Sequence, residues 1–190
     1  MTGDTTPQNK QGETLYDHQD GDARIHRRNS VWQADLTYEL HPVNEVSWVG
    51  AREYCAWLNK RLPTEAEWEF ACRAGTTTPF HSGPGFPNGT TNDGLVGTIA
   101  WYTTNSGSQT HAVGGKAANA LGLHDMLGNV WEWQSDWYGS YSLSAQTNPM
   151  GPASGAYRVL RGGGSTNSTN DVRSSMRGNG TPVNSYSYTG

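Results

Sequence analysis

The chain has 190 residues, which suits a single domain. It carries 13 Lys and Arg against 17 Asp and Glu, and the net charge of -4 argues against a broad basic surface for nucleic acid. Only 16% of residues are charged, but eight Trp and nine Tyr argue against disorder, because disordered chains are poor in aromatic residues. The 24 Gly, with many Ser, Thr and Asn, predict a loop-rich domain with an aromatic core.

Residues 1–30 hold nine charged residues and few apolar ones, and they show no helical or strand period. We expect a flexible or partner-ordered polar arm here, which offers a route to a homo-oligomer or to assembly into a particle. The domain proper is predicted to span residues 31–190.

The location of the protein is left open by the sequence. No apolar run approaches the ~20 residues that cross a bilayer, so no membrane span is expected. Residues 1–7 lack the charged and apolar regions of a signal peptide. We expect the chain as written to be cytosolic, unless a targeting signal carried elsewhere directs it to a virion or a cell surface.

A first helix is predicted over residues 47–59. Ser47 is a good N-cap, and Ala51, Tyr54, Cys55 and Leu58 follow the spacing of one buried helix face. The aromatic residues of this region and of later motifs are expected in the core, namely Trp48, Trp57, Trp68, Trp131 and Trp133.

A second helix is predicted to start at Thr64, which forms a capping box with Glu67, and to stop at Gly75. Its inner face should carry Trp68, Ala71 and Cys72. The two cysteines, Cys55 and Cys72, lie in helical patterns, so buried thiols are expected, with one bridge between the helices as the alternative.

The rest of the chain predicts loops and short strands. Residues 75–97 are rich in Gly, Pro, Thr and Asn, which predicts a long loop that is pinned by aromatic side chains or serves a function. Strands are predicted over residues 99–102, 128–133 and 158–162.

Four motifs occur in a fixed order along the chain: HPVNEVSW at residues 41–48, LPTEAEWEF at 62–70, GLHDMLGNVWEW at 122–133 and RVLRGG at 158–163. Together they resemble the formylglycine-generating-enzyme (sulfatase-modifying factor) family. The resemblance implies an α+β, C-type-lectin-like fold with two helices, a small twisted antiparallel sheet and much irregular loop.

The same resemblance bears on catalysis. Enzymes of the family bind copper through two cysteines in their C-terminal region, whereas this chain has no Cys after Cys72. Because Cu(I) prefers soft sulfur ligands, we expect no copper and no formylglycine-generating activity. Related iron enzymes use an extra His-bearing domain, and the six His here show no paired ligand spacing, so no iron is expected either. A metal-dependent oxidoreductase stays as the enzymatic alternative.

A calcium site is also implied by the resemblance. The matching positions would supply two carboxylates and two backbone carbonyls, which are hard oxygen ligands suited to Ca²⁺. The candidate ligands are Asp125, Gly128, Val130 and Glu132. In the alternative interpretation, the Asp125 and Glu132 carboxylates only accept hydrogen bonds from backbone amides of the loop.

Residues 164–190 have an unusual composition, since 21 of the 27 residues are Asn, Ser, Thr, Tyr, Asp or Gly. Antibody paratopes use similar residues, because Tyr supplies contact area and small polar side chains adapt their hydrogen bonds. The segment resembles the variable region of proteins diversified by retroelements, which mutate adenines in Asn codons. Val172, Arg173 and Arg177 would be fixed scaffold residues, with both arginines bound to carboxylates or carbonyls.

This resemblance predicts a non-catalytic protein that binds a protein or glycan on another cell or particle. Tyr186 and Tyr188 would anchor the ligand. The expected ligand-binding residues are Ser165, Thr166, Asn167, Ser168, Asn170, Asp171, Gly178, Asn179, Gly180, Asn184, Tyr186 and Tyr188. A disordered tail, a drifted homologue, and a structural or receptor-binding subunit of a phage or virus are the alternatives.

Overall fold

The computed structural model describes residues 7–29 and 31–190. The described residues form helices α1 (Trp48–Trp57) and α2 (Glu65–Arg73) and a short 3₁₀ helix, η1 (Asp93–Thr98). They also form two antiparallel sheets, one of β1 (Ile25–Arg28) with β2 (Val31–Ala34), and one of β3 (Glu132–Trp137), β4 (Arg158–Arg161) and β5 (Gly178–Gly180) in the order β3-β4-β5.

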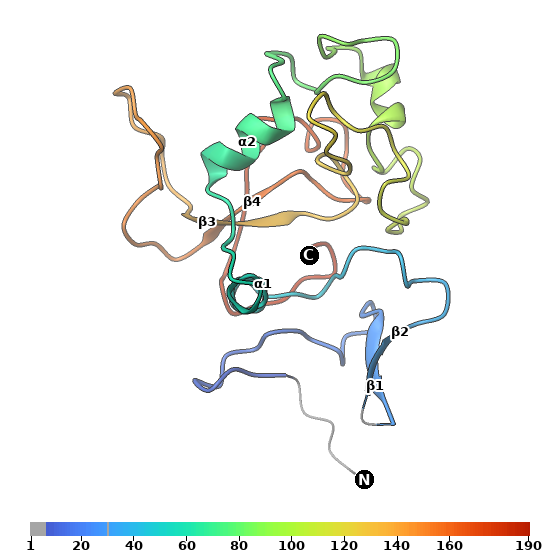
Figure 1. Ribbon diagram of the computed structural model, residues 1–190, viewed down its shortest axis with the longest axis vertical. Coiled ribbons are helices and arrows are strands. Elements are labelled where there is room, and N and C mark those ends of the chain that lie inside the picture. The colour runs from blue at the N-terminus through green and yellow to red at the C-terminus, as the bar shows by residue number, and fades with distance from the viewer. Residues whose placement is uncertain (1–6, 30) are drawn as a thin grey trace.

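Both helices contact the three-stranded sheet, and long irregular segments surround this centre (Figure 1). The expected α+β, C-type-lectin-like architecture is confirmed. None of the helices in the described ranges is long and apolar enough to cross a bilayer.

Helix α1 begins as predicted, with the Ser47 Oγ accepting a hydrogen bond from the Gly50 amide at 3.0 Å. The predicted buried face is partly wrong. Trp48 and Val49 are buried, whereas Tyr54 is 61% exposed. Trp57, which was expected in the core, is 75% exposed, and Leu58 also faces solvent. The buried side chains belong to the first turn of α1, and the helical period alone does not say how far along a helix the neighbouring elements reach.

Helix α2 has the predicted capping box. The Thr64 Oγ1 accepts from the Glu67 amide at 3.2 Å, and the Glu67 carboxylate accepts from the Thr64 amide at 2.8 Å. Trp68 and Cys72 are buried on the inner face. Both cysteines carry free thiols, so the alternative of a bridge between the helices is wrong.

The core consists of two clusters of buried apolar side chains. One joins α2 to the long loop, and the Phe80 and Phe86 rings of that loop are both buried in it. The loop is therefore pinned by aromatic residues as predicted. The other cluster contains three of the expected tryptophans, Trp48, Trp131 and Trp133.

Two of the predicted strands need correction. Residues 99–102 form only an isolated bridge between Trp101 and Gly128. The strand predicted at 128–133 begins at Glu132, because Gly128 (φ +80°) and Asn129 (φ +63°) take the left-handed conformation, which interrupts extended backbone. The strand predicted at 158–162 is confirmed as β4.

A polar arm is expected over residues 1–30, of which 1–6 and 30 lie outside the described residues; residues 7–29 pack against the rest of the chain. The Ser47 amide donates to the Leu15 carbonyl at 3.2 Å, and Tyr16 forms a bridge with Val46. The boundary expected at residue 30 falls between two paired strands, since β1 and β2 align from the pair Ile25–Ala34 onward. This packing uses mostly backbone hydrogen bonds, which leave little trace in an apolar sequence pattern.

Gly50→Ala tests this packing. A Cβ atom at residue 50 would lie 2.1 Å from the Leu15 carbonyl oxygen, which is too close for any real contact. Alanine favours a helix over glycine by about 1 kcal/mol, yet we expect a lower melting temperature and faster hydrogen exchange at residues 14–17 and 47. Glu53→Ala, on the exposed side of α1, is the control. A higher melting temperature for Gly50→Ala would contradict the packing.

Candidate functional site

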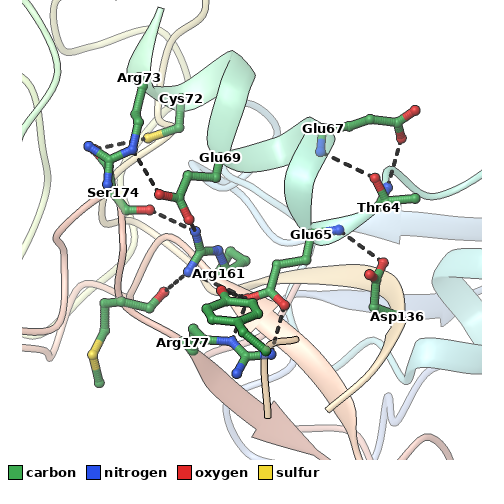
Figure 2. Close-up of polar contacts among 12 residues, drawn as sticks. Thr64, Glu65, Glu67, Glu69, Cys72, Arg73, Asp136, Arg161, Ser174 and Arg177 are labelled. Carbon is green, nitrogen blue, oxygen red and sulfur yellow. Dashed lines mark hydrogen bonds and ion pairs between the residues drawn. The ribbon is translucent and has the colours of Figure 1, made fainter. Parts of the chain in front are cut away.

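The C-terminal segment, residues 164–190, is joined to the core by a buried arginine (Figure 2). Arg161 on β4 is fully buried, and its guanidinium donates to the Met176 carbonyl at 2.7 Å and to the Ser174 carbonyl at 2.8 Å. It also contacts the carboxylates of Glu69 and, at 3.6 Å, Glu65. One side chain therefore connects the sheet, helix α2 and the polar segment.

A second arginine extends this network. Arg177 forms a bidentate pair with the Glu65 carboxylate, at 2.6 and 2.8 Å, and donates to the Gly139 carbonyl at 2.8 Å. Arg173 donates to the Asn170 carbonyl at 2.8 Å. The prediction that both arginines bind carboxylates or carbonyls is confirmed, and Val172 is fully buried, as expected of a scaffold residue.

Helix α2 supplies the other side of this junction. The Glu65 amide at its first turn donates to the Asp136 carboxylate at 2.9 Å. The Cys72 thiol lies 3.5 Å from the Ser174 hydroxyl, and burial raises the pKa of this thiol to about 12. Cys72 is therefore protonated at neutral pH and acts as a packing residue.

Half of the twelve expected ligand-binding residues are exposed to solvent. They are Thr166, Ser168, Asn170, Asn179, Asn184 and Tyr188. They follow the C-terminal segment over several elements: Thr169, between Ser168 and Asn170, bonds Asp93 of η1, whereas the Pro182 carbonyl accepts from Val49 of α1. The exposed positions are thus distributed along the whole segment.

The loop at residues 164–171 contains structural residues that the sequence did not distinguish from the exposed ones. Ser165 is buried, and its carbonyl accepts from the Ser106 hydroxyl at 2.6 Å. The Asn167 side-chain oxygen accepts from the Trp131 indole at 2.8 Å. Asp171 accepts from both the amide and the hydroxyl of Ser168. Hydrogen bonds therefore fix the shape of this loop from within.

The remaining expected residues pack on tryptophan rings. A Cβ atom at Gly178 would lie 2.9 Å from the Trp131 ring, and one at Gly180 would lie 2.6 Å from the Trp133 ring. Tyr186 is partly buried against Trp133, with ring centroids 6.2 Å apart. The two glycines are therefore needed for close packing, which makes them scaffold residues.

Tyr188 is 41% exposed and stacks on Tyr186 at a centroid distance of 5.2 Å. It lines a pocket of about 130 Å³ beside the N-terminal segment. The pocket brings together residues from five segments, among them Asp22, Tyr38, Thr110, Ser165, Thr166 and Tyr188. Three of the expected ligand-binding residues therefore meet here.

A larger cavity of about 680 Å³ lies between α2 and residues 139–152. Its walls include Phe70 and Met150. Its charged residues are Glu65, Glu69, Asp136 and Arg177, of which Glu65 and Arg177 form an ion pair. The Tyr141 hydroxyl also donates to Glu65, at 3.0 Å. None of the expected ligand-binding residues lines this cavity.

Two of the expected calcium ligands, Asp125 and Glu132, are carboxylates that interact electrostatically. The Asp125 Oδ2 accepts from the Gly114 amide at 2.7 Å, while its Oδ1 is buried without a hydrogen-bond partner. Glu132 accepts from the Trp68 indole at 2.8 Å. Burial, aided by the charge of Asp125, raises the pKa of Glu132 to about 7. An orphaned carboxylate oxygen beside a second carboxylate fits a bound cation.

Comparisons with known proteins place this geometry among related chains. Residues 8–190 match the model of the sulfatase-modifying factor enzyme 1-like domain, so the match includes most of the segment expected to be an arm. The serine/threonine-protein kinase pkn1 of Chlamydia caviae is 42% identical over 165 residues, which cover 85% of this chain and 25% of the kinase. The formylglycine-generating enzyme of Bos taurus is 41% identical over 65% of this chain and 34% of that enzyme.

Two solved structures resemble the fold over most of the chain. Treponema denticola variable protein 1 has a TM-score of 0.71 and 30% identity, covering 81% of this chain and 70% of that one. PvdO from Pseudomonas aeruginosa has a TM-score of 0.68 and 25% identity, covering 86% of this chain and 63% of PvdO. This chain spans about a quarter to a third of the two curated relatives named above.

Glu65→Gln tests the buried network. The change keeps the shape of the side chain but leaves Arg161 and Arg177 without a full counter-charge, so we expect a loss of about 3 kcal/mol in the free energy of unfolding. Urea denaturation at pH 7 measures this loss. Arg61→Ala, which removes only a surface ion pair with Glu67, should leave the unfolding midpoint nearly unchanged. Equal midpoints for the two variants would show that the network is not needed.

Proposed function

The chain belongs to the sulfatase-modifying factor enzyme 1-like family, and we propose that it is a non-catalytic, ligand-binding variable protein diversified by a retroelement. One observation carries the proposal. Along residues 164–190, anchors such as the buried Val172 and the ion-paired Arg177 are interspersed with small polar residues that are exposed, such as Ser168 and Asn170. A face built in this way tolerates changes at the exposed positions without loss of the fold.

The donor set supports a binding role over copper chemistry. The two cysteines of the chain lie on separate helices, and the Cys72 thiol is buried, bonded to Ser174 and held protonated by its raised pKa. A Cu(I) site needs a pair of accessible thiolates. These residues do not fit copper, so we assign no oxidase step to this chain.

The ligand class follows from the chemistry of the exposed face. Thr166, Ser168 and the exposed asparagines offer hydroxyl and amide groups without charge, and Tyr188 offers a ring beside a small pocket. Such groups suit a protein or glycan on another cell or particle. Tyr188 is the ligand anchor in this proposal, whereas Tyr186 supports it from the core.

Sequencing the region beside the gene tests the proposal. We expect a near-copy of the 3′ end of the gene that differs only at adenines of the template. The differences should fall in codons of exposed positions, namely Thr166, Ser168, Asn170, Asn179, Asn184 and Tyr188. Codons for Gly180, Arg161 and Val172 should be identical in the two copies. The absence of a near-copy, or changes concentrated at these three scaffold codons, would contradict the proposal.

We also propose that Asp125 and Glu132, with the carbonyls of Gly128 and Val130, hold Ca²⁺ as a structural ion. After treatment with a chelator, the melting temperature should fall, and CaCl₂ should restore it, because an ion that binds the folded state stabilises it. Hydrogen exchange at residues 125–132 should slow on adding Ca²⁺ and should not respond in Glu132→Gln. Glu53→Gln on the exposed side of α1 is the control. Unchanged exchange at 125–132 would rule out this site.

A further inference from the structure

A second group of acidic residues lies where the N-terminal segment meets the residues that precede α1. Asp20, Asp22 and Glu45 each place a carboxylate oxygen within 4.8 Å of the other two. The two aspartates are exposed, whereas Glu45 is only 2% exposed. Glu45 lies shortly before α1, which begins at Trp48. The cluster therefore joins residues that are more than twenty positions apart in the sequence.

Glu45, the buried member of the cluster, has a carboxylate oxygen without a hydrogen-bond partner. The Glu45 carboxylate is turned toward the two aspartates, and its Oε1 is buried without a hydrogen-bond partner. Burial and the charges of Asp20, Asp17 and Asp22 together raise the pKa of Glu45 to about 7, although a hydrogen bond with Ser185 acts to lower it. A buried carboxylate oxygen with no partner is costly, and neighbouring like charges add to that cost.

We propose that Asp20, Asp22 and Glu45 form a Ca²⁺ site, separate from the one at Asp125 and Glu132. All three donors are carboxylates, which are hard ligands. Oxygens at about 2.4 Å from one Ca²⁺ lie up to about 5 Å apart, which matches the separation in the cluster. The exposed aspartates leave the site open to solvent, so water completes the coordination.

The site lies at the junction between the N-terminal segment and the C-terminal face. The Asn44 side chain, next to Glu45, donates to the Asp22 carbonyl at 2.9 Å and to the Ser187 carbonyl at 3.3 Å. Asp22 also lines the 130 Å³ pocket together with Tyr188. A bound cation would therefore fix residues 17–22 against this face whether or not the face is diversified.

Calcium titration of the full chain, after removal of metal by a chelator, tests the site. Calorimetry with CaCl₂ should detect binding, and Ca²⁺ should slow hydrogen exchange at residues 17–23 and 44–46. Glu45→Gln should abolish this local protection, and Asp22→Asn should weaken binding there about tenfold or more, because affinity follows the number of charged ligands. Glu53→Gln, which removes an exposed acidic group on α1 outside the triad, should behave like the unchanged chain.

The readouts separate this site from the other proposals. Slower hydrogen exchange at residues 125–132 reports on the Asp125 site. Slower exchange at residues 17–23 reports on the triad, and the two readouts are independent. Asp22 is exposed, so Asp22→Asn gives a folded variant even if Glu45→Gln does not fold. Unchanged exchange at 17–23 on adding Ca²⁺, or equal protection in Asp22→Asn and the unchanged chain, would overturn the assignment.

Discussion

The burial of the Arg161 guanidinium is the constraint on which the C-terminal half of the structure depends. A fully buried charge is tolerated only when carboxylates and carbonyls surround it, and here Glu65, Glu69, Ser174 and Met176 do so. Residues 164–190 contain few apolar side chains with which to form a core of their own. The arginine compensates for that lack because it binds their backbone directly to the sheet and to α2 (Figure 2).

Tryptophan residues also hold residues 164–190 against the core. The Trp131 amide donates to the Tyr188 carbonyl at 2.7 Å and its indole donates to Asn167, so one residue holds two distant parts of the segment. Gly178 and Gly180 let β5 lie directly on Trp131 and Trp133. The packing thus depends mainly on residues that face inward, whereas exposed residues such as Ser168 and Tyr188 contribute through hydrogen bonds of their backbone or side chain.

The sequence predicted those features whose cause is local. The capping box of Thr64 and Glu67 depends on spacing within one turn, and the aromatic anchoring of residues 75–97 follows from the apolar character of the rings. Exposure of Tyr54 and Trp57 depends on which elements cover α1, and the helical period holds no such information. In the same way, composition could not separate Ser165 from Thr166, because only the position of Ser106 makes one of them buried.

The charges of Arg161 and Glu45 are compensated in different ways. The positive charge of Arg161 is balanced within the chain by Glu65 and Glu69 of α2. Glu45 is buried as deeply as a core residue, yet the charges nearest to it are those of further carboxylates. Glu45 lies within the motif at residues 41–48, whereas the aspartates come from a segment with no recognisable period. Only the packing of that segment against the start of α1 brings the three acidic groups together, and a cation from solution balances charges that the chain itself leaves crowded.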